Sequence, residues 1–134
     1  MIGFDTNVLI RVFVDDTRSP RQVAAARHLA ASSTERIRIS IVVLVEAIWT
    51  LRRHCGMKRA GLIRFLQDVL DHPKFDVESR WAVEDAFEEY VNWKLDFADS
   101  LIKALNTRAG ARTTFTFDQT ATGLTHFTLI ETEA

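Results

Sequence analysis

Short apolar segments alternate along the chain with longer segments in which apolar residues recur at helical spacing. The short segments predict five strands: Met1–Phe4, Ile37–Ile39, Phe75–Val77, Thr113–Phe117 and Phe127–Ile130. The longer segments predict helices, as at Leu62, Leu66 and Val69, which lie one helical turn apart. Strands separated by helices favour a parallel sheet with helices on both faces, so the predicted fold class is α/β.

Polar residues, glycine and proline mark where the predicted helices begin and end. A short helix is expected over 8–14, and Ser19-Pro20 predicts one that runs to about residue 31. Ser40 predicts a helix over 41–55, which Gly56 ends, and Asp96 predicts the last one, before Gly110.

The helix expected after Ser79 has two distinct faces. Its apolar residues are placed to face inward: Val83, Phe87, Tyr90 and Val91. Its acidic residues form the opposite, solvated face: Glu84, Asp85, Glu88 and Glu89.

The composition is that of one globular domain. The 134 residues are 47% hydrophobic and 26% charged, with 5 Gly and 2 Pro, which excludes a disordered, collagen-like or disulfide-framework chain. A chain of this length can bury one core, so we expect a single domain over residues 1–134. The longest uncharged apolar run, Ile41–Val45, is far too short to cross a membrane.

Three features favour a cytoplasmic location. The single cysteine, Cys55, cannot form an internal disulfide, which fits a reducing compartment. Residues 1–5 lack a cationic start and include an acid, so we expect no secretory signal. No membrane-spanning segment is predicted.

The charge is unevenly distributed. Residues 1–67 carry 11 Lys and Arg against 5 Asp and Glu, whereas residues 68–134 carry 6 against 13. The asymmetry fits one face that tolerates polyanions, and it fits equally well a scatter of charges over a compact surface. The net charge of −1 argues against a protein that merely coats nucleic acid.

Two carboxylates stand where predicted strands end. Asp5 follows the first strand, and Asp118 follows Thr113–Phe117. In open parallel sheets, sites form at the carboxyl ends of strands, where the strand order reverses. If these two strands are neighbours at that point, Asp5 and Asp118 face one crevice.

Glu46 and Asp99 each have a structural and a functional interpretation. Glu46 interrupts a nearly apolar helix, where an unpaired buried carboxylate is costly enough to be protonated or to recruit a cation. Glu46, Thr50 and Arg53 also follow one another at i, i+4 and i+7, as in a solvent-facing stripe. Asp99 lies in the first turn of its predicted helix, four residues before a lysine, which suits an ordinary helix-stabilising acid.

Carboxylates that converge on one crevice favour a divalent metal. They repel one another by about 1 kcal/mol per pair at 4 Å in water, and a bound cation removes that repulsion. All-oxygen sites suit Mg²⁺ or Mn²⁺, and two such ions roughly 4 Å apart can hydrolyse a phosphodiester. The candidate zinc ligands lack paired spacing: His28, His54, Cys55, His72 and His126.

Four segments carry these acids in a recognisable order: Met1–Arg11 (MIGFDTNVLIR), Ser40–Glu46 (SIVVLVE), Asp96–Ile102 (DFADSLI) and Thr114–Asp118 (TFTFD). Their order and spacing resemble the acidic motifs of PIN-domain proteins, especially the VapC-type toxins of bacterial toxin–antitoxin pairs. The resemblance implies a three-layer fold with one parallel sheet in strand order 3-2-1-4-5, in which the first and fourth strands are neighbours.

The resemblance also implies a site and an activity. It carries over four acids as catalytic metal ligands: Asp5, Glu46, Asp99 and Asp118. It makes four residues supporting polar groups: Thr6, Asn7, Ser100 and Thr116. The implied protein is an Mg²⁺- or Mn²⁺-dependent endoribonuclease that cleaves structured RNA (transfer or ribosomal RNA). It forms a homodimer and is held inactive by a cognate VapB-like antitoxin.

One departure from the resemblance lies outside the acidic motifs. Close relatives often carry an Asp-Asp-Pro-x-Gln run, whereas here Thr17–Ser19 separates Asp15-Asp16 from Pro20. Because this loop lies outside the acidic motifs, the departure bears on what the resemblance implies for substrate or partner contacts, and not on what it implies for catalysis.

Basic residues between 47 and 67 are the candidate RNA contacts, because no acid stands among them. They are Arg52, Arg53, Lys58 and Arg59, with Arg64 further on. Such a cluster positions phosphates without reading sequence, although solvated helix ends look the same. Trp49, Trp81 and Trp93 occupy core positions of the pattern, with base stacking as the less favoured alternative.

Other functions stay open or are disfavoured. A non-catalytic PIN-like module would bind RNA or a protein, although it would not need four mutually repelling acids. A PIN nuclease of RNA processing would act without an antitoxin. A receiver domain needs an aspartate after the third strand, and residues 50–57 contain none. Asn7 replaces the second acid of an Asp-x-Asp phosphatase, and no Gly-x-Gly-x-x-Gly occurs for a dinucleotide.

Overall fold

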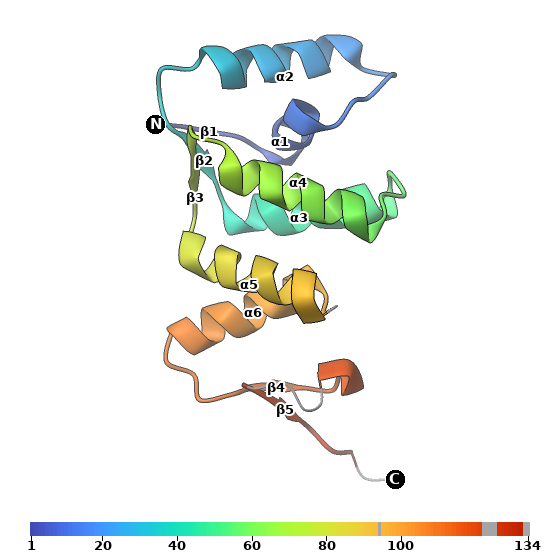
Figure 1. The fold of residues 1–134 in the computed structure, drawn as a ribbon, viewed down its shortest axis with the longest axis vertical. Helices are drawn as coiled ribbons and strands as arrows, with labels where there is room; N and C mark the ends of the chain where they lie inside the picture. The colour runs from blue at the N-terminus through green and yellow to red at the C-terminus, as the bar shows by residue number, and fades with distance from the viewer. Residues whose placement is uncertain (94, 122–125, 133–134) are drawn as a thin grey trace. The chain divides into compact units, whose positions relative to one another are not determined.

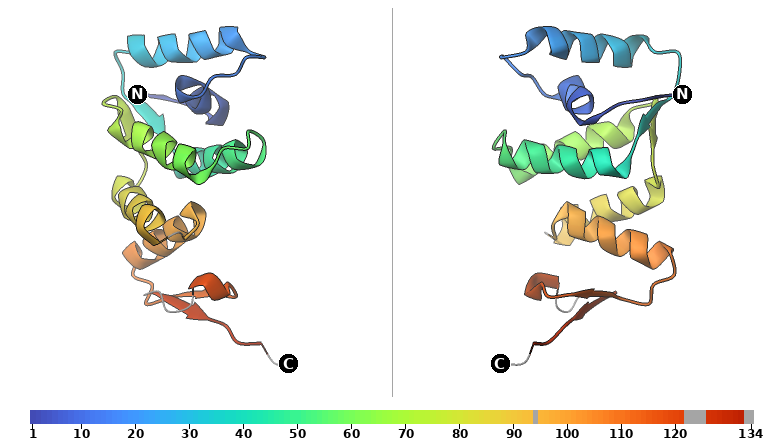
Figure 2. Two further views of the ribbon diagram at one scale, coloured as in Figure 1. Left: turned by 45° about the vertical axis from the view of Figure 1, so that its right-hand side comes forward. Right: turned by 180° about the vertical axis from the view of Figure 1, so that it is seen from behind.

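The computed structural model describes residues 1–93, 95–121 and 126–132, and the chain divides into two compact units, Met1–Arg80 and Trp81–Ala134 (Figures 1 and 2). None of the helices in these described ranges is long and apolar enough to cross a membrane.

The first unit consists of a small sheet and four helices. In chain order its elements are β1 (Ile2–Gly3), α1 (Thr6–Phe13), α2 (Pro20–Ser32), β2 (Ile37–Ile39), α3 (Ile41–Arg53), α4 (Arg59–Asp71) and β3 (Phe75–Val77). The three strands pair in parallel in the order β1-β2-β3, with Ile37 opposite both Ile2 and Phe75. Figure 1 shows α1 between α2 and α3, and α1 contacts both.

The alternation of β2 explains its central position. Ile37 and Ile39 are fully buried on one face of the sheet, whereas Arg38 lies on the other and pairs with Asp76 of β3 at 2.8 Å. The core of this unit continues through apolar residues of the helices, among them Leu9, Leu44, Leu51, Leu62 and Leu66.

Two helices of the first unit begin directly at the carboxyl ends of neighbouring strands. Asp5 is the N-cap of α1 and accepts a hydrogen bond from the backbone N–H of Val8 at 3.3 Å. Ser40 is the N-cap of α3 and accepts one from Val43 N–H at 3.3 Å. Because β1 and β2 are parallel neighbours, the first turns of α1 and α3 start at the same edge of the sheet.

The second unit contains α5 (Arg80–Trp93), which starts at the last residue of the first unit, α6 (Phe97–Arg108), β4 (Thr114–Thr116), a short 3₁₀ turn over Gln119–Ala121, and β5 (Phe127–Leu129). β4 and β5 pair in parallel, with Thr114 opposite Phe127. Phe97 and Leu101 are buried along α6, and the ring of Phe97 meets that of Tyr90 edge-on at 6.2 Å.

The predicted α/β class is confirmed, and every predicted strand and helix is present within a few residues of its expected bounds. The predicted single sheet in the order 3-2-1-4-5 is not confirmed, because the strands form two separate parallel sheets, β1-β2-β3 and β4-β5. Each of these sheets lies within one unit. A single domain over residues 1–134 stays a prediction.

Several details of the helices differ from the predictions. Ser19 and Asp96 occupy N-cap positions, yet neither side chain makes the capping hydrogen bond. Val91, predicted to face inward, is exposed. Glu89, predicted to be solvated, is only 17% exposed, because Lys103 of the adjacent helix α6 pairs with its Oε2 atom.

Candidate active site

The first unit brings Glu46 to the start of α1. The hydroxyl of Thr6, the residue after Asp5, donates a hydrogen bond to Oε1 of Glu46. Thr6 is buried and lies in the first turn of α1, and Glu46 lies in the second turn of α3. The common starting edge of these two helices therefore explains a contact between residues 40 positions apart.

Glu46 is exposed, so of its two interpretations from the sequence the solvent-facing stripe holds. Thr50 is half-buried and Arg53 is exposed on the same helix, as expected for a solvent-facing stripe. The carboxylate is therefore not an isolated buried charge. Its fixed feature is the hydrogen bond from Thr6, which orients one carboxylate oxygen.

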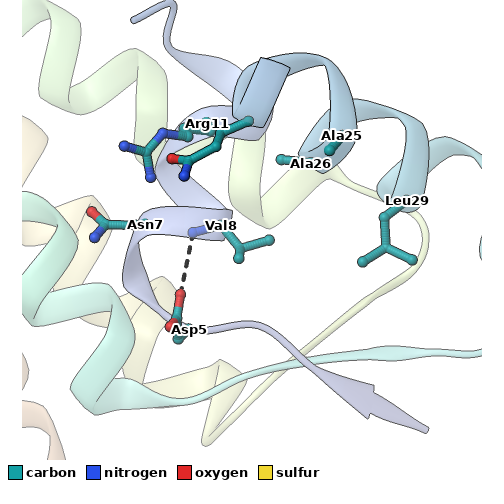
Figure 3. Close-up of a pocket in the computed structure, with 8 residues that line it drawn as sticks. Asp5, Asn7, Val8, Arg11, Ala25, Ala26 and Leu29 are labelled. Carbon is teal, nitrogen blue, oxygen red and sulfur yellow. Dashed lines mark hydrogen bonds between the residues drawn. The ribbon is translucent and has the colours of Figure 1, made fainter. Parts of the chain in front are cut away.

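Asp5 holds a second carboxylate at this edge. Its Oδ1 atom accepts the backbone N–H of Val8, as the dashed line in Figure 3 shows, and the side chain is exposed. Asp5 and Asn7 also line a cavity of about 380 Å³ between α1 and α2. Capping therefore explains the orientation of Asp5 without occupying its whole carboxylate.

The second unit gathers two further predicted ligands. Asp99, in the first turn of α6, and Asp118, just after β4, line one small cavity of about 120 Å³ together with Thr116. The Thr116 hydroxyl accepts the backbone N–H of Asp118 at 3.0 Å. The end of β4 thus fixes the backbone that carries Asp118.

Two hydrogen bonds from Thr120 favour the ionised form of Asp118. Its Oδ1 atom accepts hydrogen bonds from the hydroxyl of Thr120 at 2.7 Å and from the backbone N–H of Thr120 at 2.9 Å. These two hydrogen bonds lower the pKa of the Asp118 carboxyl below its usual value. An ionised carboxylate that accepts hydrogen bonds on one oxygen has the form that a metal ligand requires.

The chemistry of the donor set fits a hard divalent cation. All four predicted ligands offer carboxylate oxygens, which Mg²⁺ and Mn²⁺ prefer. Within the described residues, the second oxygen of Asp5, of Glu46 and of Asp118 accepts no hydrogen bond from the chain. Within either unit, the described residues place no group of three or more His, Cys, Asp or Glu to hold an ion. The four-acid site predicted from the sequence draws on both units and stays a prediction.

The supporting residues differ in environment. Asn7 is exposed, whereas Ser100 is almost completely buried, with a hydroxyl that lacks a hydrogen-bond partner among the described residues. A buried hydroxyl without a hydrogen-bond partner costs folding free energy, and Ser100 directly follows the predicted metal ligand Asp99.

The candidate RNA contacts lie at the end of α3 and the start of α4. Arg52, Arg53 and Lys58 are exposed, and Arg59 is half-buried. The exposure of Arg52, Arg53 and Lys58 suits a contact with phosphate.

The placement of two tryptophans in the core is wrong. Trp49 is 47% exposed and Trp81 is 71% exposed, with the guanidinium of Arg108 lying 5.3 Å from the Trp81 ring centre. The side chain of Trp93 lies outside the described residues.

The sequence pattern did not reveal the contact between Thr6 and Glu46 or the environment of Arg11. Arg11 lies four residues after Asn7 in the sequence, a spacing that places two residues on the same face of a helix and that could have linked them. Both residues line the cavity of Figure 3, where their side chains project from the same side of α1.

These features define an α/β protein whose acidic residues follow the strands β1 and β4 and occupy early turns of α3 and α6. Residues 2–122 match the PIN domain, a span that includes all four acids, and the chain therefore belongs to the PIN domain family. PIN domains are typically metal-dependent nucleases that use divalent ions such as Mg²⁺. No curated protein matches the chain.

Proposed function

We propose that the chain is a metal-dependent endoribonuclease that hydrolyses phosphodiester bonds in structured RNA, and that it is the toxin of a toxin–antitoxin pair. The observation that carries the proposal is that each unit holds two of the four acids in a defined polar environment. Thr6 links the start of α1 to Glu46, and Asp99 and Asp118 line one cavity. Membership of the PIN domain family supports the nuclease reaction, and the resemblance of Met1–Arg11 to VapC-type toxins supports the toxin role.

The proposed metal ligands are Asp5, Glu46, Asp99 and Asp118. The ion, Mg²⁺ or Mn²⁺, supplies an activated water and positive charge for the leaving oxygen when bound. Attack by that water predicts products with 3′-hydroxyl and 5′-phosphate ends.

The chain's own hydrogen bonds orient these carboxylates before any ion binds. Thr6 fixes Oε1 of Glu46, and Thr120 fixes Oδ1 of Asp118. Thr116 holds the backbone of Asp118. Asn7 and Ser100 are proposed as the remaining polar groups around the acids. Pre-oriented ligands reduce the reorganisation that accompanies metal binding.

The proposed substrate is transfer or ribosomal RNA, and the proposed RNA contacts are Arg52, Arg53, Lys58 and Arg59. A VapB-like antitoxin and a homodimer rest on the resemblance to the toxin family. A cytoplasmic location fits an enzyme that acts on these RNAs.

The test is cleavage of unfractionated transfer RNA by the purified full chain in Mg²⁺, in Mn²⁺ and in EDTA. Asp99→Asn removes one proposed ligand charge, and Glu88→Gln is the matched control, because Glu88 is an exposed acid of α5. We expect metal-dependent cutting that Asp99→Asn abolishes and Glu88→Gln retains, with both variants folded by circular dichroism.

Three outcomes contradict the proposal. Full activity of Asp99→Asn excludes the acid from the metal site. Cyclic-phosphate ends indicate attack by the ribose 2′-hydroxyl instead of water. No cutting of transfer or ribosomal RNA by the folded, antitoxin-free chain, together with the absence of carboxylate-dependent Mn²⁺ binding in calorimetry, favours a non-catalytic binding module.

A further inference from the structure

A cavity of about 410 Å³ with several polar lining residues runs along α1 in the first unit. The end of α1, the following loop and the last turn of α3 enclose it. Its polar lining includes Asn7, Arg11, Asp16, Thr50 and His54. Asn7 and Arg11 also line the cavity that begins at Asp5, so these two residues form a wall shared by both cavities.

Arg11 is the unusual residue of this wall. Its side chain is only 21% exposed, and among the described residues its Nε atom is buried without a hydrogen-bond partner. Its ion pair from Nη2 to Oδ2 of Asp16 is 3.6 Å long, which exceeds the range of a hydrogen bond. A guanidinium carries five N–H donors in a fixed fork, so Arg11 has donors available for a further acceptor.

The neighbouring side chains present donors to the same space. Asn7 is exposed, and within the described residues neither its amide nor the hydroxyl of Thr50 makes a hydrogen bond. Figure 3 shows the side chains of Asn7 and Arg11 projecting from the same side of α1. A bidentate guanidinium flanked by an amide and a hydroxyl is suited to phosphate oxygens.

The acids in the loop do not cancel this preference. Asp15 pairs with Arg27 at 2.9 Å, and Asp16 is shared between Arg11 and Arg18, each at 3.6 Å. The lining holds Arg11 and Arg18 against Asp15 and Asp16, and the charge of Asp15 is already paired with Arg27, which lies outside the lining. The long contact between Arg11 and Asp16 is one that a phosphate dianion or diester can replace.

The distance from Arg11 to the proposed site suits a neighbouring phosphate. Arg11 is six residues after Asp5, which corresponds to roughly 9 Å along the helix axis. We propose that Arg11, with Asn7 and Thr50, binds an RNA backbone phosphate beside the phosphodiester that is cut, and that Asp16 pairs with Arg11 when RNA is absent. This inference rests on the proposed nuclease function and makes Arg11 a substrate-binding residue.

The experiment measures binding of unfractionated transfer RNA to the full chain in EDTA, at several KCl concentrations, so that no cleavage is required. Arg11→Gln removes the charge and the fork, and Arg11→Lys keeps the charge alone. Arg21→Gln is the matched control, because Arg21 is exposed on α2 and lines neither cavity. Asp16→Asn removes the competing charge and keeps an oxygen for the backbone N–H of Arg18, which Asp16 accepts at 3.0 Å.

We expect Arg11→Gln to weaken RNA binding by about 10-fold and to reduce the slope of log K against log[salt] by about 1. Arg11→Lys keeps the slope and loses part of the affinity, since an ammonium cannot bind in a bidentate manner. Asp16→Asn strengthens binding. Arg21→Gln matches the unmodified chain. In cleavage assays, Arg11→Gln raises KM and leaves kcat within about 3-fold.

Equal affinity and equal slope for Arg11→Gln and Arg21→Gln would overturn the inference. If Arg11→Gln fails to fold, Asp16→Asn decides alone, and unchanged or weaker RNA binding by that variant rejects the competition with Asp16. Failure of the nuclease proposal alone gives a different result. The unmodified chain would then bind RNA, with a slope of log K against log[salt] that Arg11→Gln reduces, but it would cut no RNA.

Discussion

The hydrogen bond from Thr6 to Glu46 gives the most direct test of how the first unit prepares its acids. Thr6→Val keeps the size and β-branching of the buried side chain and removes only the hydroxyl donor. A hydrogen bond to a charged acceptor contributes about 1.5–3 kcal/mol. Because Glu46 is exposed, water replaces the lost donor, and the expected loss of folding stability falls below that range, at about 1 kcal/mol or less.

The expected effect on function is larger than the effect on stability. Loss of a group that orients a metal ligand typically costs 10–100-fold in metal affinity or activity. A 10-fold loss corresponds to about 1.4 kcal/mol, which one charge-assisted hydrogen bond can supply. We therefore expect Thr6→Val to need at least about 10-fold more Mn²⁺ for half-maximal cleavage of transfer RNA.

The assay titrates Mn²⁺ for the unmodified chain, Thr6→Val and Thr6→Ser, and follows thermal unfolding of each. Thr6→Ser keeps the hydroxyl and should stay close to the unmodified chain in its metal requirement. An unchanged Mn²⁺ requirement for Thr6→Val would show that this hydrogen bond does not prepare Glu46 for the ion. A loss of activity accompanied by unfolding would instead assign Thr6 a structural role.

Three further predictions concern pH, packing and the second unit. Burial, and then the nearby Lys74, lower the pKa of His72 below 6.5. The contribution of His72 to folding stability is therefore complete above pH 6.5 and is lost as the pH falls below that value. Urea unfolding near pH 7.5 and near pH 5 should show this loss of stability, and the substitution His72→Gln should abolish the pH-dependent difference. Leu66→Ala should cost about 2–5 kcal/mol in urea unfolding because Leu66 is fully buried, whereas Leu29→Ala, at a position 44% exposed, should cost under about 1 kcal/mol; equal losses would contradict the assigned core. Thr120→Val removes the hydroxyl that donates to Asp118, so the pKa of that carboxyl should rise in an NMR titration, and an unshifted pKa would contradict the hydrogen bond.

Local chemistry made the positions of most elements predictable. The strands Ile37–Ile39 and Phe75–Val77 have the bounds expected from the sequence, because each alternates apolar and charged residues and is followed by polar residues. Ser40 caps α3 as its position before an apolar helix suggested. The end of α3 at Arg53 rather than residue 55 reflects how helix ends fray and how little sequence determines them.

Contacts between distant segments were not predictable from periodicity. Nothing in the spacing of Thr6 and Glu46 indicates a hydrogen bond, which depends on β1 and β2 being parallel neighbours. Glu89 falls on the acidic face of α5 in the pattern, yet Lys103 of a different helix covers it. A large apolar side chain such as Trp81 counts as core in any periodic pattern, although a helix also carries such residues at its surface.

The shortness of the two connections at the starting edge of α1 and α3 sets how this chain tolerates insertions. Only Phe4 and Asp5 separate β1 from α1, and only Ser40 separates β2 from α3. One residue added to either connection would turn the following helix by about 100° and shift it by about 1.5 Å relative to its strand, which would swing Thr6 away from Glu46. The connection between α1 and α2, over residues 14–19, carries no such constraint, and it contains the departure from the Asp-Asp-Pro-x-Gln run noted in the sequence. Length variation among related chains should therefore accumulate in that loop, which borders the polar cavity, and leave the two short connections unchanged.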